Sequence, residues 1–425
     1  MPAFPAQPRK PRLSVAMIAR NEAELVTATI ESVRGIADEI VVLDAFSSDD
    51  TASQAKQLGA KLAYSPWCDD LSALRNHCLE KTSGDWILWT EPGERLDADS
   101  AISLRQFVDQ QIDSRTAYLL MIEVPPADAT TCRKQAAQIR LLPNWSSLRF
   151  SGRAGEGLRD AIRAAEMAIR LAPGRLLRDS RCDDPQRRAR RAQSLLKLLA
   201  LEAEESGGYS PRLLLALGDA QAELGSSADA QQAYLHAVAT SPRGSTEMLE
   251  AYLGLLRSLA ADQPRMLQIS TCLNALETFP LDAQLLLAMG DYLQAHKRLD
   301  LATRSFEAAF KFGKVNLETW HLADWHAMAA ACYSLALESE NRVEEAQRVL
   351  EEALAQHPRS PRLRRRLAEV SVNRGLVEAM LADVDSAGRT VRIDPHADST
   401  PPRPVISATA SQNKPSVTPG SPPVS

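Results

Sequence analysis

The sequence contains none of the patterns that identify a membrane-spanning or a secreted, cysteine-stabilised protein. No run of about 18 apolar residues occurs, and Met1–Arg12 lacks the apolar segment of a signal peptide. The six cysteines are widely scattered and none forms a CxxC pair, which excludes a clustered zinc site and favours reduced thiols. We therefore expect a cytoplasmic protein without a transmembrane segment.

A strong excess of charge of one sign is also missing. The chain has 49 Lys and Arg against 54 Asp and Glu, a net charge of −5, so nucleic-acid binding would need a local basic patch. The two basic clusters, Arg187–Arg191 and Arg362–Arg366, have acidic neighbours at helical spacing and no interleaved aromatic residues. We expect both to form solvated faces or salt bridges at a domain junction, and we expect no nucleic-acid partner.

The composition is that of a globular protein, with 44% hydrophobic and 24% charged residues, and 425 residues predict two or three domains. The opening stretch has the clearest pattern. Leu13–Ala19 is apolar and too short for a helix, which indicates a strand buried on both faces. Apolar residues recur at helical spacing over Glu22–Arg34, with Asn21 as the N-cap candidate. A second apolar run, Glu39–Leu43, completes a βαβ unit with parallel strands.

Ligands of such a sheet bind beyond the carboxyl ends of its parallel strands. In this sequence the polar side chains at that edge are Asn21, Glu22, Asp44 and the turn Ser47–Asp50. Asp44 lies at the carboxyl end of the second strand, where it either contacts a ligand or caps its own turn. We take this edge as the candidate binding site.

The alternation of strands and helices continues and predicts an α/β fold. The expected elements are a helix at Thr51–Leu58, a strand at Lys61–Ser65, a helix at Leu71–Glu80 and a strand at Trp86–Thr90. Further along we expect a helix at Ala101–Gln111, a strand at Ala117–Val124, a loop at Pro125–Gln135 and an antiparallel pair of Gln138–Leu142 with Ser147–Phe150.

From about Gln186 the strand patterns stop and helical periodicity takes over. The tetratricopeptide template of about 34 residues fits two separate windows, and Ala346, Leu350, Ala353 and Pro358 match it again for a second helix. Its small, large and proline positions are filled by Leu214, Gly218, Ala230, Tyr234, Ala237 and Pro242, and again by Leu286, Gly290, Ala302, Phe306 and Ala309. Thr246–Pro280 fits as a weaker repeat, and Val315–Trp325 is interpreted as an insertion. Such hairpins bury their faces only against neighbours, so we expect an all-α solenoid.

These patterns divide the chain into four parts. We expect a flexible arm over residues 1–12, an α/β domain over 13–185, helical repeats over 186–375 and a mostly disordered tail over 376–425. The tail prediction rests on Pro395–Ser425, which is rich in Pro, Ser and Thr and has almost no aromatic residues.

Several of these stretches together resemble a known family. The resemblance is carried by Arg20-Asn21-Glu22 after the first strand, the second strand ending in Asp44, the Arg75-Asn76 helix, Gly84-Asp85-Trp86 and the turn Glu91-Pro92-Gly93-Glu94. In this order they resemble the tetratricopeptide-bearing branch of the family 2 glycosyltransferases, which have the Rossmann-like α/β architecture called GT-A. The resemblance covers roughly Leu13–Leu158 and, more loosely, the repeats to about Pro358.

The resemblance implies a transferase of the hexosyl type that uses a nucleotide-diphosphate sugar. The residues it implies for binding that donor are Asn21, Glu22, Asp44, Asp49 and Arg75. Glu91 is the implied ligand of Mg²⁺ or Mn²⁺, and Glu94 and Glu156 are the implied catalytic carboxylates. The acceptor, a protein or a glycan, is unknown, and the repeats imply a protein partner.

Two departures from the family pattern bear on this inference. Gly93 stands where the family has its second metal-binding Asp, which weakens the metal site, and Gly155 stands where a His precedes Glu156. Single residues also have ordinary alternatives, since Arg75 fits a solvated helix face and Glu156 fits a surface loop. Two functions stay open: sugar transfer, and a catalytically degenerate relative that acts as a nucleotide-binding or protein-interaction scaffold through its repeats.

Overall fold

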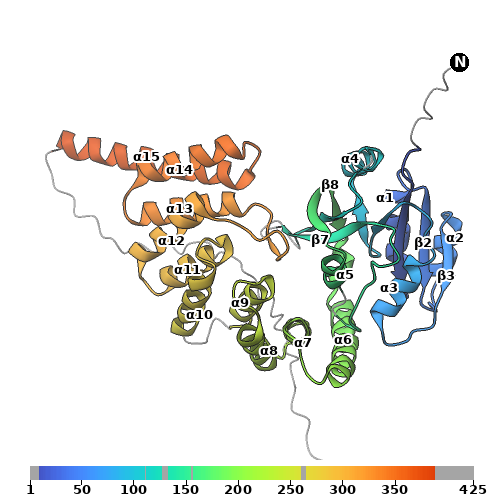
Figure 1. Ribbon diagram of the computed structural model, residues 1–425. Coiled ribbons are helices and arrows are strands. Elements are labelled where there is room, and N and C mark those ends of the chain that lie inside the picture. Colours follow the sequence, from blue (N-terminus) through green and yellow to red (C-terminus); the bar gives the residue numbers. More distant parts are fainter. Residues whose placement is uncertain (1–8, 111, 127–132, 155–156, 260–264, 388–425) are drawn as a thin grey trace, which may run out of the picture.

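A computed structural model describes residues 9–110, 112–126, 133–154, 157–259 and 265–387 of the chain. It shows a mixed α/β domain followed by a row of stacked helices (Figure 1). The predicted fold class, α/β and then all-α, is confirmed. The C-terminal tail from residue 388 onward lies outside the described residues.

The opening half of the sheet is parallel, as its apolar runs predict. Strand β1 (Leu13–Ala19) lies between β2 (Glu39–Asp44) and β4 (Trp86–Trp89), and β3 (Lys61–Tyr64) pairs in parallel with β2. The ladder places Ala19 beside Asp44 and Asp44 beside Tyr64. The carboxyl ends of these strands therefore meet at one edge.

The second half of the sheet differs from the prediction. The strands β5 (Glu94–Leu96), β6 (Thr116–Val124), β7 (Lys134–Pro143) and β8 (Ala168–Arg178) complete the order β3-β2-β1-β4-β7-β6-β8-β5. Strand β7 is antiparallel to both β4 and β6, so the expected partner at Ser147–Phe150 is wrong and this segment is not a strand. The expected loop at Pro125–Gln135 ends at Lys134, where β7 begins, and its residues 127–132 are outside the described part.

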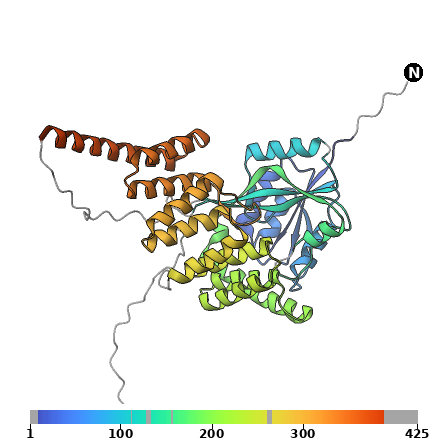
Figure 2. The same cartoon turned by 60° about the vertical axis from the view of Figure 1, so that its left-hand side comes forward.

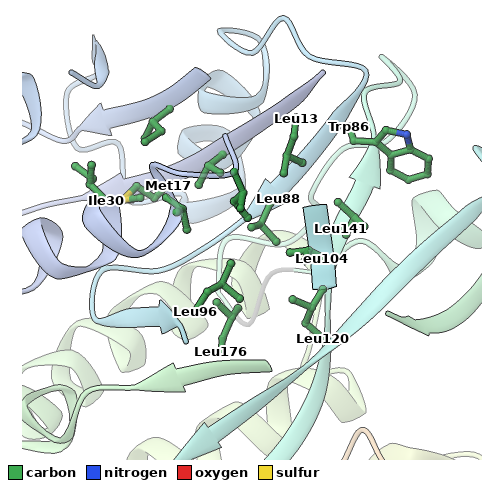
Figure 3. Close-up of a cluster of buried hydrophobic side chains, with 14 of the residues drawn as sticks. Leu13, Met17, Ile30, Trp86, Leu88, Leu96, Leu104, Leu120, Leu141 and Leu176 are labelled. Carbon is green, nitrogen blue, oxygen red and sulfur yellow. The ribbon is translucent and has the colours of Figure 1, made fainter. Parts of the chain in front are cut away.

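Helices cover both faces of this sheet. Their bounds are α1 (Ala23–Val33), α2 (Thr51–Gln57), α3 (Leu71–Leu79), α4 (Ala98–Asp109) and α5 (Arg159–Ala164). Figure 3 shows one face, where Ile30 of α1 and Leu104 of α4 pack against Met17, Leu88 and Leu120 of the sheet. The opposite face packs against α3 and α5. Strands covered in this way read as continuous apolar runs, which is why the sequence revealed them.

The helical part begins with a long helix and continues as antiparallel pairs. Its bounds are α6 (Pro185–Ser206), α7 (Pro211–Glu223), α8 (Ser227–Thr240), α9 (Thr246–Ser258), α10 (Arg265–Thr278), α11 (Ala283–Ala295), α12 (Leu299–Phe312), α13 (Trp325–Ser339), α14 (Val343–Gln356) and α15 (Pro361–Ala387). Figure 2 shows these helices stacked in sequence order. Helix α15 extends past residue 375, where the sequence placed the end of the repeats. In the described part of the chain, no helix has the length and apolar character needed to cross a membrane.

Close ring-to-glycine packing holds the repeats together. A Cβ atom on Gly218 of α7 or on Gly254 of α9 would lie 2.6 or 2.5 Å from the ring of Tyr234, which fills the space between them. Gly290 and the ring of Phe306 repeat this arrangement, with a hypothetical Cβ at 2.3 Å. The small and large positions of the repeat template are therefore confirmed.

The insertion between α12 and α13 joins the solenoid to the sheet. Its strand β9 (His321–Leu322) pairs antiparallel with the start of β7, opposite Gln135 and Lys134. The Ala137 N–H donates a hydrogen bond to the Leu317 carbonyl, and Glu318 forms an ion pair with Arg159 of α5. Figure 1 shows the insertion returning to the sheet beside β7. An insertion here is confirmed, but its strand was not predicted.

Candidate functional site

The loops that follow β1 and β2 are fastened to each other by Asn21. Its Oδ1 accepts a hydrogen bond from the Ser48 N–H at 2.8 Å, and its own N–H donates to Ser47 Oγ at 2.9 Å. The backbone of Asn21 is left-handed, with φ of 57°, a conformation that Asn adopts more readily than most residues. The predicted N-cap role is wrong: Glu22 occupies the N-cap position of α1 and makes no capping hydrogen bond in the described structure.

Asp49 holds the same two loops together. It accepts hydrogen bonds from the N–H groups of Ala23, at 3.2 Å, and Thr51, at 3.0 Å, and from the Thr51 hydroxyl. Burial would raise the pKa of Asp49, but the hydrogen bonds from Thr51 and Ala23 lower it below its usual value. By accepting these hydrogen bonds, the Asp49 carboxylate fixes the shape of the two loops. Its contact with a nucleotide sugar stays a prediction.

Asp44 is the buried carboxylate at this edge. It is 2% exposed, and its Oδ2 accepts a hydrogen bond from the Ser47 N–H at 3.0 Å. Its Oδ1 is also buried and has no hydrogen-bond partner among the residues that the structure describes. A buried acceptor without a donor is costly, so this oxygen is poised to accept an N–H or O–H from a ligand.

Two exposed aromatic side chains stand beside Asp44, and the sequence analysis missed both. Phe46 is 63% exposed and Tyr64 is 54% exposed, with ring centroids 6.5 Å apart. Phe46 has a left-handed backbone, with φ of 53°, which is unusual for an aromatic residue. Exposed rings of this kind offer a stacking face for a nucleobase. The sequence feature that could have indicated this site is Phe46, an aromatic residue directly before a turn of Ser and Asp residues.

Arg75 reaches this edge from α3. Its Nη1 lies 2.8 Å from Glu91 Oε1, and its guanidinium lies over the rings of Trp89, at 4.9 Å, and Phe150, at 5.1 Å. Guanidinium groups stack in this way on aromatic faces. Arg75 is therefore fixed by the protein rather than solvated.

Arg140 of β7 is a second functional candidate that the sequence analysis missed. Its Nη2 donates to Glu94 Oε1 at 2.7 Å and to Gln138 Oε1 at 3.0 Å, and its Nη1 lies 3.6 Å from Glu91 Oε1. Glu94 Oε2 accepts the Glu91 N–H at 3.0 Å, which closes the turn between β4 and β5. No local pattern marks Arg140, because its partners come from a turn far away in the sequence.

The two carboxylates of this turn have opposite pKa shifts. Burial raises the pKa of Glu94, and Arg140 offsets only part of this effect. Burial would also raise the pKa of Glu91, but Arg75, Arg140 and the Trp89 indole lower it below its usual value. Glu91 is thus a stable carboxylate inside an ion-pair network.

The residues of this turn do not fit a protein-held divalent cation. Gly93 has φ of 91°, and a Cβ placed there would lie 2.3 Å from Cys182 Sγ, so an Asp at this position would strain the backbone and require Cys182 to move. Glu91 and Glu94 point into arginines, which would compete with a cation. Across the described residues, no three Asp, Glu, His or Cys side chains gather as a metal site would require. The metal-ligand role of Glu91 stays a prediction.

The remaining predicted residues lie at the junction with the helices or outside the described part. Glu22 Oε2 forms an ion pair with Arg187 of α6 at 2.8 Å, and the same guanidinium lies 2.9 Å from Glu24. Burial raises the pKa of Glu22, and Arg187 opposes this shift. Glu156 falls within residues 155–156, which the structure does not describe.

Parts of the sequence match known families. Residues 14–103 match the model of glycosyl transferase family 2, and residues 325–370 match a tetratricopeptide repeat model. A tetratricopeptide repeat-containing protein of Synechococcus elongatus is 41% identical over 99 residues, 23% of this chain and 25% of that protein. An uncharacterized glycosyltransferase of Rickettsia felis is 36% identical over 92 residues, 22% of this chain and 30% of that protein. The chain therefore spans well under two thirds of the length of these relatives.

Solved structures align with each part of the chain at low TM-scores. A thermophilic tetratricopeptide protein of Thermus thermophilus covers 44% of this chain and 100% of its own, with 23% identity and a TM-score of 0.30. Glucosyl-3-phosphoglycerate synthase of Mycobacterium tuberculosis, in complex with Mn²⁺ and uridine-diphosphate-glucose, covers 27% of this chain and 43% of its own, with 20% identity and a TM-score of 0.23. The sequence matches therefore make residues 14–103 similar to family 2 glycosyltransferases and residues 325–370 similar to a tetratricopeptide repeat.

Proposed function

We propose that the α/β domain binds a nucleoside-diphosphate sugar at the carboxyl edge of β1, β2 and β4 and transfers the sugar to an acceptor. The match of residues 14–103 to a glycosyltransferase family supports glycosyl transfer as the general role. The observation that carries the binding site is Asp44, whose buried Oδ1 has no partner in the described structure. It lies beside the exposed rings of Phe46 and Tyr64.

Each part of the donor has a matching group at this edge. Asp44 Oδ1 accepts an N–H of the base, and Phe46 and Tyr64 supply a ring face on which the base stacks. Arg75, held over Trp89, supplies a cation for the diphosphate. Glu156 remains our candidate for the general base that deprotonates the acceptor hydroxyl. The acceptor, a protein or a glycan, is bound with help from the repeats, since stacked helical pairs form extended binding surfaces.

A second function is favoured by one specific observation. Cys182 occupies the space that a side chain at position 93 would need, so the family's metal motif is closed rather than merely altered. A chain of this kind can keep its nucleotide site and act as a scaffold, with the repeats binding a protein partner. The difference between the two functions is turnover, and binding alone does not separate them.

The test is donor turnover by the full chain. Uridine-, guanosine-, adenosine- and thymidine-diphosphate sugars are incubated with the protein, with Mn²⁺ or with a chelator, and release of the nucleoside diphosphate is measured. We expect one donor to be hydrolysed or transferred at a rate that Asp44→Ala abolishes. The control is Glu80→Ala, because Glu80 is an exposed carboxylate at the end of α3 and is not one of the candidate site residues. Binding of a donor without turnover in either condition would support the scaffold instead.

A further inference from the structure

We propose that Arg75 and Arg140 form an anion site in which the carboxylate of Glu91 is the resident occupant, and that this site takes the diphosphate without a protein-held divalent cation. The proposal rests on the proposed nucleotide-sugar function. It identifies which groups hold the phosphate oxygens and adds an internal competitor that the family resemblance does not imply.

The donors around Glu91 are those of a phosphate site. Its Oε1 lies 2.8 Å from Arg75 Nη1 and 3.6 Å from Arg140 Nη1, and it accepts a hydrogen bond from Trp89 Nε1 at 2.8 Å. Two guanidinium groups and one indole N–H thus converge on a single anionic oxygen. Arginines that present several N–H groups to one anion recognise both carboxylate and phosphate oxygens.

The arginines are held by groups other than Glu91. Arg75 stacks against the rings of Trp89 and Phe150. Arg140 is buried on β7, where Glu94 and Gln138 accept its Nη2 hydrogens. Departure of the Glu91 carboxylate would therefore leave both guanidinium groups in place. A preorganised site of this kind does not need to be reordered when the anion arrives.

The two carboxylates of the cluster are not equivalent. The Glu94 side chain is 5% exposed and is fixed between Arg140 and the Glu91 N–H, whereas the Glu91 side chain is 32% exposed. Glu91 is the one that can turn toward solvent. Once it has left, two guanidinium groups face one carboxylate, and the site has a net positive charge that suits a diphosphate.

Binding measurements with the full chain test this proposal. Isothermal titration of inorganic pyrophosphate and of the four nucleoside diphosphates is carried out in chelator and in Mn²⁺. In chelator we expect wild-type protein to bind at least one nucleoside diphosphate. We expect Glu91→Gln to bind it and pyrophosphate about tenfold more tightly, because one charge-assisted competitor has been removed. The matched control is Glu80→Gln, which removes an exposed carboxylate at the end of α3.

Two arginine variants complete the test. Arg75→Gln should weaken pyrophosphate binding about tenfold or more, and Arg75→Lys should restore part of it, with thermal unfolding of both variants as the check on folding. Unchanged or weaker binding in a folded Glu91→Gln protein would overturn the proposal. Binding that requires Mn²⁺ would overturn the proposal alone and leave the nucleotide function standing. Binding of no nucleoside diphosphate in either condition would overturn both.

Discussion

The carboxylates at the edge of the sheet are of two kinds, and their hydrogen bonds distinguish them. Asp49 and Glu94 receive backbone N–H groups or a buried arginine, and they hold loops in place. Asp44 has one oxygen that the described residues leave without a donor, and Glu91 is met by two arginines and the Trp89 indole. In the proposals above, Asp44 contacts the ligand directly, whereas Glu91 gives up its donors to the ligand.

Replacement of Asp44 should separate binding from stability. We expect Asp44→Ala to weaken nucleotide binding while changing the free energy of unfolding by no more than about 1 kcal/mol. The lost hydrogen bond to the Ser47 N–H is offset because a buried, unpaired oxygen is also removed. Titration calorimetry and urea unfolding measure the two effects. Unfolding of the domain by this change would make Asp44 structural and the site assignment wrong.

A side chain at Gly93 should be destabilising whatever its charge. We expect Gly93→Ala to lower the free energy of unfolding by about 1–3 kcal/mol, because φ is 91° and the new Cβ meets Cys182 Sγ. Adding Cys182→Ala to Gly93→Ala should recover the part of the lost stability that comes from the clash. It should not recover the part that comes from the strained backbone at Gly93. Urea unfolding of the two single variants and the double variant separates these terms. Additive effects would contradict the clash.

The stability of the chain should depend on pH through Glu250 of α9. Burial, with help from Asp219 and Glu247, raises the pKa of Glu250 to about 7, and Arg257 and Arg159 offset only part of this. The folded chain therefore keeps this proton at a pH where the unfolded chain releases it. Stability is largest below the unfolded pKa of Glu and falls as the pH rises toward 7.

Replacement of Glu250 tests that dependence. Because Gln has no proton to lose, Glu250→Gln should raise the midpoint of thermal unfolding at pH 8 more than at pH 5. Differential scanning calorimetry at both pH values provides the measurement. An equal shift at both pH values would mean that Glu250 is charged in the folded protein.

Among the helices, the packing of Tyr234 against two glycines should make stability sensitive to an added methyl group at either glycine. Gly254→Ala should lower the free energy of unfolding by about 1–3 kcal/mol, because the added methyl group overlaps the ring. Gly375→Ala is the control, since a Cβ on Gly375 of α15 meets no atom within 4 Å. Chemical denaturation followed by helical circular dichroism compares them. An equal effect of both changes would show that helix propensity, and not contact with the Tyr234 ring, determines the change in the free energy of unfolding.

Sequence periodicity predicted the elements that are buried evenly and missed those that are not. Leu13–Ala19 and the repeat positions around Tyr234 carry their burial as a regular pattern. Strand β8 contains Pro173 and Gly174 and is mostly exposed or half-buried, so it has neither alternation nor an apolar run. Its place in the sheet depends on pairing with β6, which no local pattern encodes.

The candidate site divides in the same way. Asp44 and Asn21 were placed correctly at the sheet edge, because the strand-to-helix turns that carry them are local. Arg140 was missed because its role depends on β7 lying antiparallel beside β4. The sequence predicted Glu91 as a metal ligand. The arginines that surround it in the structure are distant from it in the sequence, so its local sequence does not indicate them.

The α/β domain and the solenoid are joined at several distant points. Arg187 of α6 pairs with Glu22, Arg153 pairs with Glu205, and β9 adds to the sheet beside β7. Replacement of residues 316–322 by an equal length of Gly and Ser should leave the helical circular dichroism unchanged and increase the radius of gyration in X-ray scattering. The milder Glu318→Gln, which removes only the ion pair to Arg159, should increase it less. An unchanged radius of gyration in the first variant would mean that the other junctions are enough to hold the two parts of the chain together.

The pairing of β9 with β7 is a short contact between the solenoid and a strand of the sheet. Strand β7 carries Gln135 at the contact with His321 and Arg140 at the contact with Glu94, five positions further along. The His321–Leu322 pairing is far shorter than the ladder that ties β7 to β6 from Lys134 to Leu141. Because that ladder does not involve β9, loss of the β9 pairing alone would leave β7, and Arg140 with it, hydrogen-bonded into the sheet.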